Sequence, residues 1–342
     1  MQITALHNSK QNYPDKIPVK GHSCSCERGS LDTLVQIRKS NSEPLETLRK
    51  RANAKAMNYP ILGALMDLKS ELYDHYRKAT SCCDKIDQSD GKLTSRYCNS
   101  RACMVCNRIR TAKLLNAYSP LFKHLKNPYF LTLTKPTVVA DKLRDGIGET
   151  VKQFSKINDV LRKRGIKIDC LRKLECTYSK GRFHAHLHLI VEGKEIAEMI
   201  LAEWMKRNPT SSSQGQCLKK ANKETLSELF KYVAKPPIKK DGTLNAWALD
   251  RILCAMYRKR TLQPYGLFRS KPVTEDVTPE DATLIVEDQD YDLYVWHQPT
   301  LDWISTETGL TLSGHQPTEK LLQFLTLNKS THEKGIYSEH PT

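Results

Sequence analysis

The feature that most constrains this chain is the stretch Phe183–Val191, FHAHLHLIV, in which histidines alternate with apolar residues. Side chains at every second position of a β-strand point to the same face, so His184, His186 and His188 share one face of a predicted strand. Neutral imidazoles are good ligands for divalent metal ions. The stretch therefore predicts a strand that carries a metal site, with an ordinary half-exposed strand as the alternative.

The residues before this strand, LRKLECTY followed by SKGR, predict a β-hairpin. Lys180-Gly181 suits a two-residue loop, because glycine accepts the positive φ that such a turn needs. Counting back from this turn puts Glu175 directly opposite His186 and on the same face, although a slip of one residue would turn it away. A carboxylate beside imidazoles favours Mg²⁺ or Mn²⁺, whereas zinc more often takes a sulfur-rich site.

Composition points to a polyanionic partner. The 342 residues contain 54 Lys plus Arg against 38 Asp plus Glu, a formal net charge of +16. This favours nucleic acid over a membrane as the partner. No apolar run of about 18 residues is present, and the first residues have no apolar signal core, so we expect no membrane span and a cytoplasmic protein. In that compartment cysteines are thiols or metal ligands.

A cysteine cluster precedes the predicted hairpin. Cys98-x₄-Cys103-x₂-Cys106, together with Cys82 or Cys83, offers four thiolates at spacings that suit a tetrahedral structural Zn²⁺. Free thiols are the alternative. Arginines interleave with the cysteines, so we expect a basic surface that binds DNA phosphates through Arg96, Arg101, Arg108 and Arg110.

Hydrophobic periodicity predicts an α+β fold. It indicates helices over 59–78, 142–164 and 195–206 and a strand over 129–135. This order favours an antiparallel sheet with helices packed on one face, preceded by the small cysteine-rich unit. The expected regions are a polar, loosely ordered arm at 1–58, the helix and cysteine unit at 59–115, a sheet domain at 125–270, and an acidic C-terminal segment at 271–342 with a short hairpin near 293–303.

A second set of polar residues lies on a predicted helix, LSELFKYVAK at 226–235, which two prolines end. Glu228 and Tyr232 are four residues apart and so share a face, with Lys235 close by and Lys231 to the side. Tyrosine can attack phosphorus, a carboxylate can activate water, and lysine can neutralise phosphate charge. Glu and Tyr at this spacing are common on ordinary helices, so the set gains weight only from the histidine strand.

Together these residues resemble the plasmid rolling-circle replication initiators (Rep proteins) of the His-hydrophobe-His (HUH) endonuclease superfamily, in the branch with one nucleophilic tyrosine and a nearby glutamate. The matching pieces occur in the family's order between residues 82 and 269: YCNSRACMVCNRIR, FLTLT, LECTY with FHAHLHLIV, ELFKYVAK and YGLFR. The family commonly has proline where Ala185 stands.

The resemblance implies an HUH core of RRM-like topology and a metal-dependent DNA endonuclease and strand transferase. His186 and His188 would hold Mg²⁺ or Mn²⁺, with His184 a third ligand or only a neighbour. Tyr232 would nick single-stranded plasmid origin DNA, leaving a 5′-phosphotyrosine and a 3′-OH primer. Glu228 would activate the water that ends synthesis. A host helicase and a DNA polymerase are the implied partners.

Two other functions compete with replication initiation. A transposase or conjugative relaxase of the same superfamily would use the same metal and tyrosine. A non-catalytic zinc-dependent DNA-binding regulator would need neither, and substitution of Tyr232 would then leave its activity intact.

Overall fold

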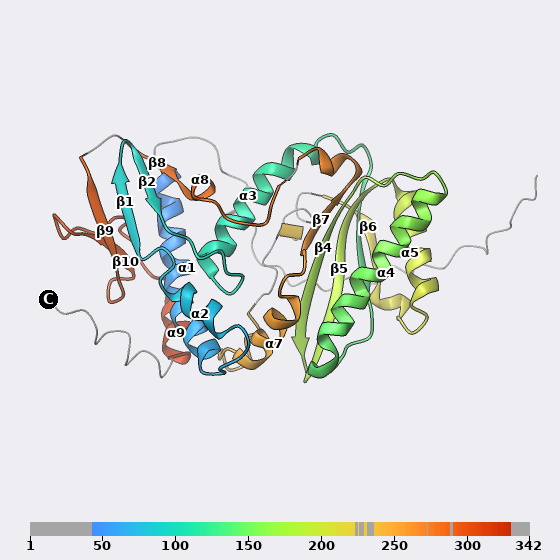
Figure 1. The fold of residues 1–342 in the computed structure, drawn as a ribbon, viewed down its shortest axis with the longest axis horizontal. Helices are drawn as coiled ribbons and strands as arrows, with labels where there is room; N and C mark the ends of the chain where they lie inside the picture. Colours follow the sequence, from blue (N-terminus) through green and yellow to red (C-terminus); the bar gives the residue numbers. More distant parts are fainter. Residues whose placement is uncertain are drawn as a thin grey trace, which may run out of the picture.

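The structure is a computed structural model that describes residues 43–329 except 223–224, 226–228, 231–235, 272 and 288–289. Two five-stranded antiparallel sheets stand side by side with helices around them, and the long helix α3 (Met104–Phe122) runs between them (Figure 1). The α+β class expected from the sequence is confirmed.

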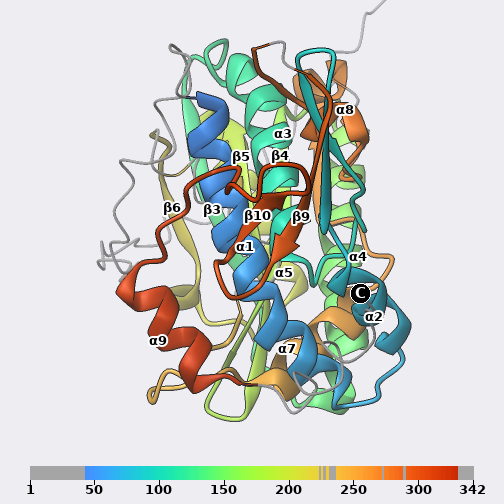
Figure 2. The same ribbon diagram turned by 90° about the vertical axis from the view of Figure 1, so that its left-hand side faces the viewer.

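The first sheet joins the two ends of the described chain. Its strand order is β10-β9-β1-β2-β8, and its strands are β1 (Lys85–Ser89), β2 (Lys92–Ser95), β8 (Leu284–Ile285), β9 (Asp292–His297) and β10 (Asp302–Ser305). Four helices accompany this sheet (Figure 2): α1 (Glu43–Met66), α2 (Tyr73–Thr80), α8 (Pro279–Ala282) and α9 (Glu319–Leu327).

The second sheet carries the histidine strand at its centre, in the order β6-β3-β5-β4-β7. Its strands are β3 (Pro128–Thr134), β4 (Cys170–Ser179), β5 (Arg182–Glu192), β6 (Cys217–Lys220) and β7 (Leu262–Tyr265). The other elements around it are η1 (Ala140–Lys142), α4 (Leu143–Lys163), α5 (Lys194–Arg207), η2 (Ser213–Gly215), α7 (Ala246–Met256) and η3 (Gly266–Ser270). The strand and helices expected at 129–135, 142–164 and 195–206 correspond to β3, α4 and α5.

Strand alternation gives the two faces of this sheet different partners. Leu187, Leu189 and Val191 of β5 are fully buried in the core that also contains Phe154 of α4 and Trp204 of α5. Both helices lie on the same side of the sheet (Figure 1). The opposite face therefore carries the histidines.

One end of the histidine face is closed by a separate apolar cluster. Ile190 of β5 and its strand neighbours pack there against the second half of α3 and against two helical residues further along the chain, Leu229 and Phe230. Phe230 stacks on Tyr118 of α3, with ring centroids 6.2 Å apart. The cluster leaves the histidine end of the same face polar.

The first helix begins earlier than expected. Residues 43–58, placed in the polar arm by their composition, form most of α1. The single helix expected over 59–78 is divided instead, because α1 ends at Met66 and α2 begins at Tyr73. The buried positions of α1 include small alanines and two cations, Arg51 and Lys55. Lys55 pairs with Asp84, and Arg51 donates to Tyr97, so these charges are buried with partners that lie far along the sequence.

The acidic C-terminal segment also differs from the expectation. The hairpin expected at 293–303 is present as β9 and β10, but β9 pairs with β1 and β8 pairs with β2. The segment is therefore part of the same sheet as the two strands that lie between Cys82 and Cys98 of the cysteine cluster. Among the described residues, no helix is both long enough and apolar enough to cross a membrane.

Candidate active site and metal centre

The hairpin has the register expected from its turn. Ser179 pairs with Arg182, and Glu175 pairs with His186. The pairing of β4 with β5 continues without interruption from Ser179 back to Cys170. Lys180 and Gly181 have φ of 49° and 78°, which is the geometry of a tight two-residue hairpin turn. The carboxylate of Glu175 therefore lies on the histidine face, as predicted.

Three of the four predicted metal-ligating residues come together. Ligand atoms of Glu175, His186 and His188 all lie within 4.8 Å of one another. His184 is a neighbour of this group, its ring centroid 5.2 Å from that of His186, but it does not belong to it. A group of two imidazoles and one carboxylate can hold a divalent cation.

Hydrogen bonds orient both imidazoles of the group. Nδ1 of His186 lies 3.1 Å from the carbonyl oxygen of His184, which can only accept, so Nδ1 carries the proton and Nε2 the lone pair. Nδ1 of His188 lies 3.1 Å from the Thr132 hydroxyl on β3, while its Nε2 lies 3.7 Å from Oε2 of Glu175. Such bonds fix ring orientation at metal sites.

The protonation states of the group suit a cation. Burial lowers the pKa of His188 to about 3, and the neighbouring His186 adds to the effect. Burial raises the pKa of the Glu175 carboxyl, but Lys173 and the two histidines lower it, and the net direction is down. Neutral imidazoles beside an ionised carboxylate are the forms that bind a metal.

Two residues that the sequence analysis did not select complete this face. Lys173 is 3% exposed, and its Nζ lies 3.0 Å from Oε2 of Glu175. It precedes Glu175 by two residues, so the hairpin register alone places it on the same face. Thr132 is opposite His188, which follows only from the pairing of β3 with β5 and has no local signal.

The predicted catalytic residues Tyr232, Glu228 and Lys235, and the predicted DNA-binding Lys231, lie outside the described residues. Their described neighbours are anchored beside the histidine face. Thr111 of α3 donates a hydrogen bond to the carbonyl oxygen of Phe230 at 3.2 Å. Phe230 belongs to the apolar cluster that contains Ile190 of the histidine strand.

The cysteine cluster is a second candidate metal centre, formed by Cys82, Cys98, Cys103 and Cys106. The Sγ of Cys106 lies 3.5 Å from that of Cys82 and 3.7 Å from that of Cys98. These separations are close to the roughly 3.8 Å expected between thiolates of a tetrahedral zinc site with bonds of about 2.3 Å. All four sulfur atoms lie within 4.8 Å of one another, so the cluster could hold a metal ion.

Polar groups around the cluster donate hydrogen bonds to two of its sulfur atoms. The side-chain amide of Asn58 donates to the Sγ of Cys103 at 3.3 Å, and the backbone N–H of Cys98 donates to the Sγ of Cys82 at 3.4 Å. Burial raises the pKa of Cys103, but hydrogen bonds from the other three thiols lower it, and the net direction is down. Donors of this kind stabilise sulfur ligands of a metal.

Cys83, the alternative fourth ligand, is turned away from the cluster. Its backbone is left-handed, with φ of 59°, and its Sγ lies 4.0 Å from the Tyr97 hydroxyl. Its carbonyl oxygen accepts a hydrogen bond from the indole of Trp303 on β10. Of the two cysteines that the sequence left open, the structure brings Cys82 into the cluster.

Two of the four arginines expected to bind DNA have partners inside the protein. Arg101 donates to Glu275 at 3.1 Å and to two backbone carbonyls, and Arg110 is 4% exposed with Asn99, Asn107 and Glu275 as partners. The expectation is wrong for Arg110, which is buried among these partners. The side chain of Arg101 is 26% exposed, and its role in DNA binding stays a prediction. Arg96 is exposed, and Arg108 is half-buried on α3.

Comparison with known proteins finds a similarity in the central part of the chain. A family model described as "Replication protein" matches residues 92–195, which include the last three cysteines of the cluster and the whole histidine hairpin. The predicted resemblance to Rep proteins is confirmed. The match does not reach the segment at 226–235 or distinguish subdivisions of the family.

Two curated relatives carry the name "Protein rep". The one from Staphylococcus aureus is 26% identical over 175 residues, which cover 44% of this chain and 75% of that protein. The one from Bacillus amyloliquefaciens is 25% identical over 163 residues, 45% of each chain. The aligned region thus spans less than half of the Bacillus Rep protein. No solved structure matches the chain.

Proposed function

We propose that this protein initiates plasmid replication by nicking origin DNA in a metal-dependent transesterification. The observation that carries the proposal is the group of Glu175, His186 and His188 on one sheet face. A replication protein needs a 3′-OH primer, and breaking one phosphodiester bond at the origin supplies it. The names of the two relatives favour replication over transposition or conjugation.

Mg²⁺ or Mn²⁺ bound to this group would neutralise charge that develops on the scissile phosphate. Glu175, His186 and His188 would hold the ion. Thr132 would keep the His188 ring oriented through the hydrogen bond at Nδ1. Lys173 keeps the Glu175 carboxyl ionised, and its ammonium adds positive charge to the face that receives the DNA.

Tyr232 is the proposed nucleophile. Its hydroxyl oxygen forms a bond to phosphorus, the bond from phosphorus to the 3′ oxygen breaks, and that oxygen takes a proton to become the 3′-OH primer. The support is the position of Phe230, two residues earlier, which packs beside the histidine face. Lys235 would neutralise phosphate charge, and Lys231 would contact the DNA backbone.

Glu228 is the proposed base for termination. After one round of synthesis it would take a proton from water, and the hydroxide would cleave the regenerated site. The cysteine cluster would bind Zn²⁺ and fix the start of α3, because Cys103 and Cys106 lie at its first turn. A host helicase would unwind the plasmid and a host polymerase would extend the primer.

The decisive experiment incubates the protein with supercoiled plasmid DNA that carries the candidate origin, with and without Mg²⁺ or Mn²⁺. We expect metal-dependent relaxation and a covalent protein–DNA adduct that survives denaturation. Relaxation without an adduct would point to a hydrolytic nuclease, and DNA binding with no cleavage in any metal would favour a regulator.

A further inference from the structure

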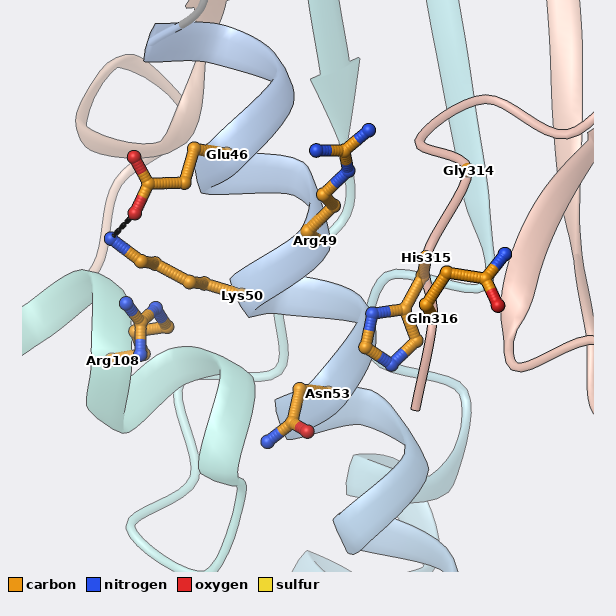
Figure 3. A pocket seen from close by; sticks show the side chains of 8 residues that line it. All are labelled: Glu46, Arg49, Lys50, Asn53, Arg108, Gly314, His315 and Gln316. Carbon is orange, nitrogen blue, oxygen red and sulfur yellow. Dashed lines mark ion pairs between the residues drawn. The ribbon is translucent and has the colours of Figure 1, made fainter. Parts of the chain in front are cut away.

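A pocket beside the first sheet is lined by none of the residues that form the two candidate metal centres. It is formed where α1, α3 and the loop before α9 meet (Figure 3). Its lining is predominantly cationic or amide-bearing and consists of Glu46, Arg49, Lys50, Asn53, Arg108, Gly314, His315 and Gln316. Three cations face one carboxylate, so the lining has a formal charge of about +2.

The pocket has one rigid wall. Asp302, which is 1% exposed, accepts hydrogen bonds from the backbone N–H groups of Ser313 and His315. Arg49 donates through Nε to the carbonyl oxygen of Ser313 at 2.9 Å, which orients its guanidinium beside the same loop. These contacts hold the loop and Arg49 in place before any ligand arrives.

Two features of the lining indicate an anionic ligand. Nε2 of His315 is buried and has no hydrogen-bond partner in the described part of the chain, a group that an ordered water or ion would satisfy. Glu46 pairs with Lys50, and Arg108 and Arg49 further lower its pKa. The cations of the lining thus stabilise the negative charge of the exposed Glu46 carboxylate.

The position of the pocket suggests which anion it takes. Arg108 lies one turn of α3 before Thr111, whose hydroxyl contacts the Phe230 carbonyl. One lining residue of the pocket thus lies a single helical turn from the α3 residue that contacts Phe230. It is open to solvent, since Glu46, Arg49 and Gln316 are all exposed, which suits a polymer backbone better than an enclosed metabolite.

We infer that this pocket binds a backbone phosphate of the DNA that flanks the nick. The inference rests on the proposed function, because it takes the DNA at the histidine face as the source of the phosphate. Arg49 and Arg108 would contact the phosphate oxygens, and Asn53 would donate from its amide. Glu46 would weaken the binding by competing for Lys50 and repelling the phosphate.

The test measures the affinity of the full-length protein for a labelled DNA duplex over a range of salt concentrations. Each phosphate that a cation neutralises contributes a salt slope of about 0.9, or roughly eightfold in affinity at 0.1 M salt. Arg49→Gln should lose part of this slope and of this affinity. Arg49→Gln combined with Arg108→Gln should lose about the whole of both, because the two side chains contact the same phosphate. Glu46→Gln should change affinity in the opposite direction and bind more tightly.

Matched controls are available on the helices that cover the far face of the second sheet. Arg162 pairs with Asp159 on α4, and Glu198 pairs with Lys194 on α5, so Arg162→Gln and Glu198→Gln repeat the two charge changes away from the pocket (Figure 1). Both should leave affinity and slope unchanged. If Arg49→Gln behaves like Arg162→Gln, or Glu46→Gln like Glu198→Gln, the inference is overturned.

A second arm identifies the source of the phosphate. Inorganic phosphate is added at constant ionic strength, and the stability of wild-type protein and Arg49→Gln is compared. If phosphate stabilises wild-type protein but not Arg49→Gln, and both bind the duplex with the same affinity, the pocket binds a free anion. That result would overturn the inference that it binds DNA. Adduct formation by wild-type protein is recorded in parallel. Absence of the adduct would reject the proposed nicking. The duplex affinities of Arg49→Gln and Glu46→Gln would still show whether the pocket binds phosphate.

Discussion

Lys173 and His188 share one carboxylate: Nζ of Lys173 lies 3.0 Å from Oε2 of Glu175, and Nε2 of His188 lies 3.7 Å from the same oxygen. The ammonium supplies positive charge to a carboxylate whose side chain is 14% exposed. A divalent ion held by Glu175 would supply the same compensation. The Lys173 ammonium and a bound metal ion would therefore stabilise the same carboxylate. Without the ammonium, metal binding should contribute more to the stability of the protein.

Lys173→Met should lower stability and raise the response to metal. The substitution leaves the Glu175 carboxylate buried without its partner, which costs about 3 kcal/mol or more. Mn²⁺ should recover part of that loss, so the rise in Tm on adding Mn²⁺ should be larger than in the wild type. Lys194→Met on α5 is the control. An equal rise in Tm in all three proteins would contradict metal binding at Glu175.

His188→Ala should abolish nicking while leaving duplex affinity within about twofold, because duplex binding is carried by cations at other positions. Relaxation of supercoiled plasmid and duplex affinity are measured on the same preparation. His297 is exposed on β9, so His297→Ala is a matched control that should nick normally. Full nicking by His188→Ala would reject the metal site.

Cys103→Ser should release one equivalent of zinc and destabilise the protein by several kcal/mol, since metal binding energy is part of the folding energy. Elemental analysis of purified protein checks the metal content. Cys83→Ser should keep its zinc, because Cys83 is turned away from the cluster. Loss of zinc from Cys83→Ser, with zinc retained in Cys82→Ser, would reverse the assignment of the fourth ligand.

Tyr232→Phe and Glu228→Ala should separate nicking from termination. Tyr232→Phe lacks the nucleophilic oxygen, so it should form no covalent adduct. Glu228→Ala should still form the adduct but should not release it by hydrolysis, so plasmid products longer than one unit should accumulate. A denaturing gel and a replication assay that resolves product length check both. Normal termination by Glu228→Ala would mean that another base activates the water.

Glu275→Gln should destabilise the protein by about 2 kcal/mol without changing metal content, because hydrogen bonds to a charged group contribute more than neutral ones. Glu275 accepts from the backbone N–H groups of Thr261 and Leu262 and from Arg101. Unfolding by urea measures the change. Glu287, which is exposed, provides a comparison in the same acidic segment. A loss in Glu287→Gln equal to that in Glu275→Gln would contradict a specific contact.

Local signals predicted the histidine hairpin well. The turn at Lys180-Gly181 sets the register of both strands, so the partner of His186 could be counted from the sequence. The same count would have placed Lys173 on the histidine face. Thr132 depends on a strand about 50 residues away and could not be found in this way.

Long-range contacts account for the other differences. Nothing near Arg101 in the sequence shows that Glu275, 174 positions later, pairs with it. The buried Lys55 of α1 depends in the same way on Asp84, so residues 43–58 read as a polar arm. The choice between Cys82 and Cys83 depends on one left-handed backbone position that the spacing of cysteines does not reveal.

The pairing of β1 with β9 has a consequence for the order of events during synthesis. Asp87 on β1 pairs with Leu293 on β9, so about 200 residues separate the two strands along the chain. At translation rates of about 5–20 residues per second, β9 follows β1 by roughly 10–40 seconds. All strands of the histidine sheet leave the ribosome within that interval. The histidine sheet can thus fold while the sheet beside the cysteines still lacks three of its five strands.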